Sequence, residues 1–397
     1  VAVRCRGLDQ WSSPRRRNVF GHVRSITSRQ LAAQVLNEIG EGARANNALA
    51  TALSTEGAAL SPRDRAFVTE LVQGTTRMRR AVDHALEPFI ERKLDEDVRS
   101  ALRMGVHQLL HLGTPPHAAV NDTVEVAPRR ARGLVNAVLR KVAQNDAVWP
   151  SEAIQFSYPD WIWNLYVDGW GEAGRESLIA MNTPERPDPR ADGYVQGQAS
   201  QWVGEVIDAA GGDGGQLVDL CAAPGGKTTA LGAHWSPVFA NEVDPARARV
   251  LQEVVQKYRP DTQVVVGDGG EAPFRDGCAD AVLVDAPCSG LGALGRRSDA
   301  RWQISEEAIE RLVGIQATLL DEAFRLLRPG GVLTYSVCTV TREETVEVPL
   351  EFDARQHKAE IIPVTQAPWR QHHQGGLVLP HDHGTDGMAV FQWRRRQ

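Results

Sequence analysis

The chain has 397 residues, more than a single hydrophobic core usually holds, so two or three domains are expected. It is 42% hydrophobic and 24% charged, as is typical of soluble globular proteins, and no apolar run predicts a membrane span or a signal peptide, so the cytoplasm is the expected location. A formal net charge of −6 disfavours a nucleic-acid partner by itself, but local arginine clusters, such as Arg296, Arg297 and Arg301, permit a basic groove.

The first part of the chain is predicted to be a flexible arm followed by helices. Residues 1–25 are rich in arginine and have no apolar periodicity, which predicts a flexible basic arm. From residue 27 onward, apolar residues recur at helical spacing, and the same period returns at 98–110 and 134–142. Residues 26–146 therefore predict an all-helical domain.

Prolines and tryptophans interrupt this pattern between residues 147 and 197. Helical pieces are expected there, and the proline-rich stretch at 184–189 is typical of a linker. The tryptophans could stack on nucleic-acid bases, but packing between domains is the commoner role for such residues. We therefore expect a linker with helical pieces over 147–197.

From residue 198 to residue 397 short β-branched runs alternate with longer amphipathic segments. The predicted strands are 216–221, 238–242, 263–266, 281–285 and 332–336, and the clearest helices between them are 245–258 and 305–328. This alternation predicts an α/β domain, a parallel sheet covered by helices on both faces. Ligands in such sheets bind beyond the carboxyl ends of the strands.

The loop after the first predicted strand is built for close approach to a ligand. It consists of Cys221, Ala222, Ala223, Pro224, Gly225, Gly226 and Lys227. Small residues, paired glycines and the N–H groups of a following helix suit a phosphate or a carboxylate. The end of the loop resembles a nucleotide phosphate loop, but the first glycine of that motif would fall on Cys221. The amino-acid end of S-adenosylmethionine is the alternative ligand.

Two acids follow the next predicted strands. Glu242 ends the second strand, where a carboxylate can bind ribose hydroxyls, and Asp268 follows the third, where it can accept a hydrogen bond from an adenine amino group. One acid at a strand end is often only a helix cap. A glycine loop and two acids at successive strand ends together favour an adenosyl pocket.

Two cysteines follow later strands. Cys288 comes three residues after Asp285, and Cys338 follows the run 332–336. The five cysteines of the chain are widely spaced, with no C-x-x-C pair, which argues against disulfides and a zinc ribbon. A single buried cysteine is usually a small hydrophobic residue. Two cysteines at the same edge of the sheet suggest that their thiols take part in a reaction.

Two thiols and a carboxyl group suit methylation at carbon 5 of cytosine. A thiolate that adds to carbon 6 makes carbon 5 nucleophilic enough to take a methyl group. Asp285 could supply a proton or a hydrogen bond to ring N3, and the second thiol could act as a general base, directly or through water. These considerations do not assign which cysteine attacks.

The residues resemble the bacterial RsmB (Sun/Fmu) ribosomal RNA cytosine methyltransferases, relatives of NOP2 and the NSUN enzymes, from about residue 27 to the end. The resemblance rests on two motifs, residues 221–227 and the Asp-Ala-Pro-Cys run at 285–288. The resemblance implies that Cys338 attacks and Cys288 assists product release, with S-adenosylmethionine held by residues 221–227 and by Glu242, Asp268 and Asp285.

The resemblance also bears on fold and partners. It implies a Rossmann-like methyltransferase sheet and, for the N-terminal part, a NusB-like RNA-binding domain, with residues 136–140 in its closing helix. The expected partner is small-subunit ribosomal RNA, with no metal, no membrane and no obligatory protein partner.

The chain departs from the family pattern at three places. Val337 and Thr339 flank Cys338 where the family usually has Thr and Ser, and Glu242 stands where Asp is commoner. The family also has a small α/β segment before the catalytic sheet, whereas residues 187–189 here run almost directly into 194–196.

Other functions are weighed against this one. A DNA cytosine methyltransferase would use Cys288 as the nucleophile, and a catalytically silent RNA-binding protein would use neither thiol. A metal site is a weaker alternative, suggested by four histidines: His372, His373, His381 and His383. A glycine-rich surface loop that holds these histidines by chance fits them better.

Overall fold

The N-terminal part of the chain folds into helices, as the apolar periodicity predicts. The computed structural model describes residues 26–184, 187–211 and 214–397, so the predicted basic arm at 1–25 lies outside the described residues. α1 begins with a capping box, in which Thr27 and Gln30 each accept a hydrogen bond from the other's backbone. The helices of this part are α1 (Ser28–Gly40), α2 (Ala45–Ser54), α3 (Pro62–Arg77), α4 (Arg79–Leu86), α5 (Glu96–Leu110), α6 (Pro116–Val126) and α7 (Arg132–Gln144).

These helices pack around two groups of apolar side chains. One group, which includes Leu31 and Leu71, joins α1, α2 and α3. The other, which includes Leu102 and Leu139, joins α4, α5 and α7. Among the described residues, no helix is both long enough and apolar enough to span a lipid bilayer.

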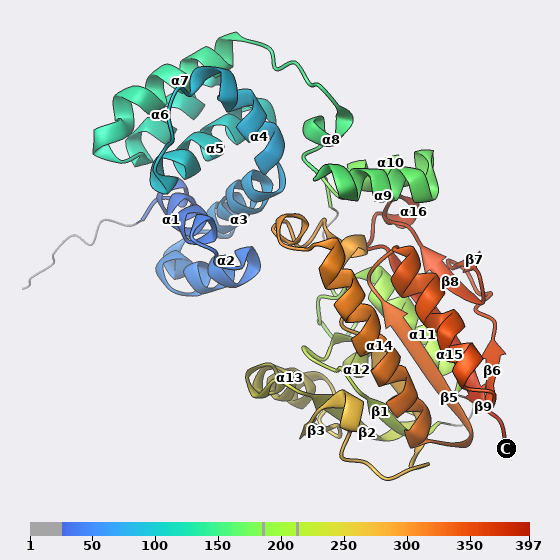
Figure 1. The fold of residues 1–397 in the computed structure, drawn as a ribbon. Coiled ribbons are helices and arrows are strands. Elements are labelled where there is room, and N and C mark those ends of the chain that lie inside the picture. Colours follow the sequence, from blue (N-terminus) through green and yellow to red (C-terminus); the bar gives the residue numbers. More distant parts are fainter. Residues whose placement is uncertain (1–25, 185–186, 212–213) are drawn as a thin grey trace, which may run out of the picture.

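Helices α8 (Glu152–Gln155), α9 (Asp160–Trp170) and α10 (Glu172–Ala180) follow, and they lie between the N-terminal helices and the sheet (Figure 1). They are the helical pieces expected in this region. Tyr158, Ile162 and Tyr166 are fully buried in the same apolar core as residues of the sheet. Burial of this aromatic segment against the sheet fixes the surface on which the N-terminal helices rest.

The second half of the chain forms a nine-stranded sheet with the order β3-β2-β1-β4-β5-β9-β8-β7, in which β6 also pairs with β9. The strands are β1 (Gly215–Asp219), β2 (Trp235–Glu242), β3 (Gln263–Val266), β4 (Ala279–Asp285), β5 (Leu327–Val337), β6 (Ala359–Ile362), β7 (Arg370–His372), β8 (Gly375–Val378) and β9 (Met388–Arg395). β1 to β5 are parallel, whereas β9 runs antiparallel to β5, β6 and β8. The predicted α/β fold is confirmed, with an antiparallel edge in addition to the expected parallel strands.

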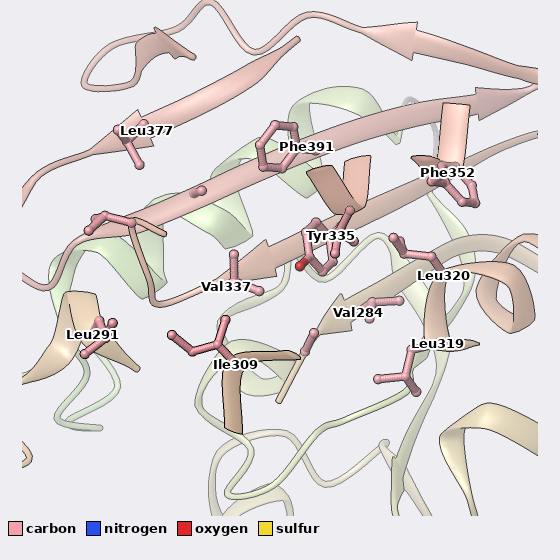
Figure 2. Close-up of a cluster of buried hydrophobic side chains, with 14 of the residues drawn as sticks. Val284, Leu291, Ile309, Leu319, Leu320, Tyr335, Val337, Phe352, Leu377 and Phe391 are labelled. Carbon is pink, nitrogen blue, oxygen red and sulfur yellow. The ribbon is translucent and has the colours of Figure 1, made fainter. Parts of the chain in front are cut away.

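Helices cover both faces of the sheet because side chains alternate along each buried strand. In β4, Leu283 packs with α11, whereas Val282 and Val284 pack with α14. Figure 2 shows the α14 side, where Val284, Tyr335 and Phe391 come from three adjacent strands. The helices of this part are α11 (Gln198–Ala210), α12 (Gly226–Ala230), α13 (Pro245–Tyr258), α14 (Glu306–Leu326), α15 (Val348–Arg355) and α16 (Pro380–His383), and a π-helix spans Glu343–Glu347.

Residues 295–302 connect the sheet region to the N-terminal helices. The bonds that join them are Ala45 N to Asp299 Oδ2 (3.2 Å), Asn46 Nδ2 to Arg296 O (3.2 Å), Arg77 Nη2 to Gly295 O (3.0 Å) and Trp302 Nε1 to Thr76 O (2.8 Å). On the other side, the fully buried Arg301 stacks on Tyr158 at 3.9 Å. This segment therefore contacts the N-terminal helices and the α8 to α9 region at once.

Candidate active site

A buried carboxyl group at the end of β1 holds the following loop in place. Asp219 ends β1, is fully buried, and accepts hydrogen bonds from Thr228 Oγ1 (2.7 Å) and Cys221 N (3.3 Å). Burial raises the pKa of Asp219 to about 7. Gly225 has a φ of +107°, and a side chain there would lie 3.0 Å from Leu251, so only glycine suits this turn. The predicted loop 221–227 thus makes a tight turn of small residues at the edge of the sheet.

The two predicted acids occupy the next strand ends. Glu242 is buried, accepts a hydrogen bond from Asp244 N at 3.0 Å, and lies 3.4 Å from Arg247 Nη2. Arg247 also donates to Ala223 O at 2.9 Å, which links the β1 and β2 loops. Asp268 is exposed and caps the short 3-10 helix Gly269–Glu271 by accepting from Gly270 N at 2.9 Å. Both acids lie at the same edge of the sheet as loop 221–227.

The two cysteines meet because their strands are neighbours. β4 and β5 are parallel, and Asp285 pairs with Ser336, so Cys288 and Cys338 leave the sheet side by side. Their sulfur atoms are 3.4 Å apart, and both residues are partly exposed. One thiol at this distance can donate a hydrogen bond to the other.

The surroundings of the two sulfur atoms differ in charge. The hydrogen bond from Cys288 lowers the pKa of Cys338 against the effect of burial, and the Arg297 guanidinium and the Lys227 ammonium lower it further. The same bond, burial and the negative charge of Glu344 raise the pKa of Cys288 well above its ordinary value. The geometry therefore favours a thiolate on Cys338 and a thiol on Cys288.

Asp285 links the cysteines to the β1 loop. Its Oδ1 atom lies 2.8 Å from Lys227 Nζ and accepts a hydrogen bond from Ser336 Oγ at 3.0 Å. Burial alone would lower the pKa of Lys227, but the Asp285 carboxylate raises it overall. Among the described residues, no hydrogen bond to the second carboxylate oxygen, Oδ2, is found, so that oxygen can face a ligand.

Known proteins share this sequence and fold. Residues 209–393 match the family described as 16S rRNA methyltransferase RsmB/F, and residues 26–144 match the NusB family. The ribosomal RNA small subunit methyltransferase B of Thermus thermophilus is 33% identical over 411 residues, which cover 94% of this chain and 99% of that protein. The chain belongs to the RsmB family of methyltransferases.

Two further comparisons report similarity in sequence and in fold. A putative methyltransferase of Mycobacterium tuberculosis is 31% identical over 458 residues, covering 96% of each chain. That alignment is longer than this chain, so the relative has segments that this chain lacks. The crystal structure of PH0851 matches with a TM-score of 0.76 at 21% identity, covering 94% of this chain and 99% of that one, which shows a shared fold.

The cofactor of this RsmB-family chain is S-adenosylmethionine. The residues at the sheet edge fit it, since loop 221–227 consists mainly of small residues with glycine at its turn, and the buried carboxylate of Glu242 lies at the next strand end. Gln196 adds a donor that the sequence did not single out. It is 6% exposed, its Nε2 atom has no hydrogen-bond partner, and it lies next to Gly226.

The residues that depart from the family pattern have defined surroundings. Val337 is fully buried and belongs to the core shown in Figure 2, so it packs in the protein interior. Thr339 keeps a hydroxyl group next to Cys338, 2.7 Å from Ser289 Oγ. Between α10 and α11 the described chain forms only a turn, with a bridge between Pro189 and Val195.

Sequence reasoning did not single out Glu344 and did not separate the arginines of one cluster. Arg297 lies beside the thiols, whereas Arg296 pairs with Asp386 at 3.3 Å and Arg301 is buried. Only their shared basic character was visible in the sequence.

The four histidines lie apart from these groups. His372 belongs to β7 and His381 to α16, rather than to the glycine-rich surface loop that was expected. Within the described ranges, no group of three or more histidine, cysteine or acidic residues could hold a metal ion.

Proposed function

We propose that this chain transfers a methyl group from S-adenosylmethionine to carbon 5 of a cytosine in small-subunit ribosomal RNA, through a covalent bond between Cys338 and the base. The observation that carries the proposal is the 3.4 Å contact of the two sulfur atoms. The cations Arg297 and Lys227 favour the thiolate on Cys338. A thiolate is the form of cysteine that attacks carbon.

Each group at the site has a part in the reaction. The Cys338 sulfur forms a bond to carbon 6, which makes carbon 5 nucleophilic, and the cofactor supplies an electrophilic methyl group. The Lys227 ammonium, 2.8 Å from Asp285, can pass a proton to the Asp285 carboxylate, and Asp285 can then hydrogen-bond to ring N3 and provide the proton that this nitrogen needs. Carbon 5 then gives its proton to solvent, N3 returns its proton through Asp285 to Lys227, and the bond between carbon 6 and sulfur breaks. The Cys288 thiol, whose sulfur lies 3.4 Å from that of Cys338 in the resting structure, can then donate a hydrogen bond to the departing thiolate.

The substrate class rests on the relatives and on the organisation of the chain. The Thermus thermophilus relative is a ribosomal RNA small subunit methyltransferase, and residues 26–144 match the NusB family. We propose residues 26–146 as an RNA-binding domain, residues 147–197 as a linker, and residues 198–397 as the catalytic domain. The target base has to leave its stack to reach the thiols, as base-modifying enzymes generally require.

The experiment that tests this function traps the covalent bond. Cys288→Ala and Cys338→Ala are each incubated with small-subunit ribosomal RNA and S-adenosylmethionine, and adducts that survive denaturation are measured by gel shift. We expect an adduct for Cys288→Ala, in which release is impaired, and none for Cys338→Ala. The opposite pattern would make Cys288 the nucleophile, as in the DNA methyltransferase alternative. No methylation of any RNA by the unmodified chain would favour a silent RNA-binding protein.

A further inference from the structure

A buried carboxylate lies directly behind the two catalytic thiols. Glu344 belongs to the π-helix Glu343–Glu347, six residues after Cys338, and its side chain is fully buried. π-helical turns are rare and often occur at functional sites. A buried acid is costly unless it is fully hydrogen-bonded, so its partners indicate why it is there.

The Glu344 carboxylate accepts hydrogen bonds at both oxygens. Oε1 accepts from Ser289 N (2.8 Å) and Gln316 Nε2 (2.9 Å), and Oε2 accepts from Ser289 Oγ (2.5 Å) and Thr341 Oγ1 (2.8 Å). An ionised carboxylate is an acceptor only, and four donors match that form. The group is therefore held in one place by residues from three separate segments.

These bonds fix the backbone on either side of Cys288. Ser289, which follows Cys288, is held by its N–H and its hydroxyl, and Gln316 Nε2 also donates to Pro287 O at 2.9 Å. Because Ser289 Oγ gives its proton to Glu344, Thr339 must be the donor in the 2.7 Å contact between the two hydroxyls. Thr339 follows Cys338, so one carboxylate connects the neighbours of both sulfur atoms.

The charge of Glu344 acts unequally on the two thiols. It raises the pKa of Cys288, in addition to the larger effects of the Cys338 contact and burial. The charged and titratable groups that face the pair are Glu344, Asp285 from β4, Lys227 from α12, Arg297 from the loop after β4, Tyr335 from β5 and Tyr166 from α9. Among them, the cations Arg297 and Lys227 lower the pKa of Cys338, and Glu344 raises that of Cys288.

We propose that Glu344 is a positioning residue that holds the two sulfur atoms in contact and keeps the shared proton on Cys288, so that Cys338 carries the thiolate. The inference rests on the proposed function for the use of that thiolate. One buried carboxylate, which touches neither the base nor the cofactor, thus accounts for the difference in reactivity between two chemically identical side chains.

The test measures the reactivity of each thiol without RNA or cofactor, so it is independent of methyl transfer. The chain is treated with iodoacetamide from about pH 6 to about pH 9, and mass spectrometry of its peptides gives the alkylation rate of Cys288 and of Cys338. In the unmodified chain Cys338 should react first. In Glu344→Gln the ratio of the two rates should fall about tenfold, the effect of one pKa unit. Glu343→Gln, an exposed neighbouring acid, is the matched control and should leave the ratio unchanged.

One outcome would overturn the inference: an unchanged rate ratio in a Glu344→Gln variant that melts as a folded protein, whether both rates stay the same or rise equally through loosened packing. If Glu344→Gln does not fold, Ser289→Ala cuts the hydroxyl connection to Thr339 while keeping the charge, and the ratio should fall about threefold. An unchanged ratio in a folded Ser289→Ala chain would then contradict the role of Glu344. A missing RNA adduct with a normal response of the thiols would instead count against the proposed function alone.

Discussion

Lys227 and Asp285 form an ion pair of 2.8 Å that joins the cofactor loop after β1 to the loop that carries Cys288. Lys227 is 9% exposed, so the pair has little solvent on its basic side. Burial opposes the charge of Lys227, but Asp285 more than offsets it and the pKa rises overall. The same ammonium favours the thiolate of Cys338. One lysine therefore contributes both to the structure of the loop and to the charge around the Cys338 sulfur.

Lys227→Met tests this double role. The change leaves the Asp285 carboxylate without its cation and removes one of the two positive charges beside Cys338. We expect the free energy of unfolding to fall by about 2 kcal/mol, between the values for exposed and buried ion pairs. The pH profile of Cys338 alkylation should also shift upward. Lys257→Met, on the last turn of α13, is the control, and an equal profile in both variants would contradict the role of Lys227.

Glu242→Gln tests the cofactor pocket by binding instead of activity. Glu242 is buried at the end of β2, and a carboxylate there accepts from ribose hydroxyls more strongly than an amide does. Titration calorimetry with S-adenosylhomocysteine should show an affinity loss of about tenfold, since hydrogen bonds to charged groups contribute about 1.5 to 3 kcal/mol. Glu253→Gln, on the exposed side of α13, should bind normally. Normal binding by Glu242→Gln would remove this residue from the pocket.

The elements with the strongest local patterns were predicted with the correct bounds. β3 and α13 coincide with the predicted ranges 263–266 and 245–258, because β3 is a short β-branched run and the buried residues of α13 recur at helical spacing. The antiparallel edge was not predicted. β9 pairs with β5, from which it is separated by about fifty residues, and no local pattern specifies such a partner. The basic run at the end of β9 also stabilises the fold, because Arg395 donates a hydrogen bond to Leu327 O at 2.6 Å.

The candidate site, like the fold, could be predicted from the sequence only in part. The meeting of Cys288 and Cys338 follows from two loops at the carboxyl ends of parallel strands, which the sequence could suggest. Glu344 could not be found, because a buried acid in a helix has the same appearance in a sequence as an exposed one such as Glu343. Its partners, Ser289 and Gln316, come from distant segments that only the fold brings together.

Tyr166→Phe tests how the α9 helix is attached to the catalytic loops. The Tyr166 hydroxyl donates to Leu291 O at 2.7 Å, and both residues are fully buried. Removal of the donor leaves a buried carbonyl unpaired, so the free energy of unfolding should fall by about 1 to 3 kcal/mol in urea titrations. Tyr194→Phe is the control, since no hydrogen bond of its hydroxyl is found among the described residues. Equal unfolding midpoints for the two variants would show that this bond contributes little.

Asp219→Asn tests the buried carboxyl group under the β1 loop through the pH dependence of stability. The pKa of Asp219 is raised by burial to about 7, whereas an unfolded chain keeps the ordinary value of 3.8. Between these two values the folded chain binds the proton more tightly than the unfolded chain does. The contribution of this group to stability is therefore most favourable below about pH 4 and falls as the pH rises to about 7.

Asparagine cannot ionise, so Asp219→Asn does not lose stability through this residue as the pH rises. From about pH 4 to about pH 8 its free energy of unfolding should rise relative to that of the unmodified chain by up to about 4 kcal/mol, the equivalent of the pKa difference. The amide can keep the contacts with Thr228 and Cys221, since its oxygen accepts and its nitrogen can donate to a hydroxyl. Urea titrations at several pH values give the two curves. Parallel curves would mean that Asp219 is ionised in the folded chain throughout this range, with its two hydrogen bonds offsetting the penalty of burial.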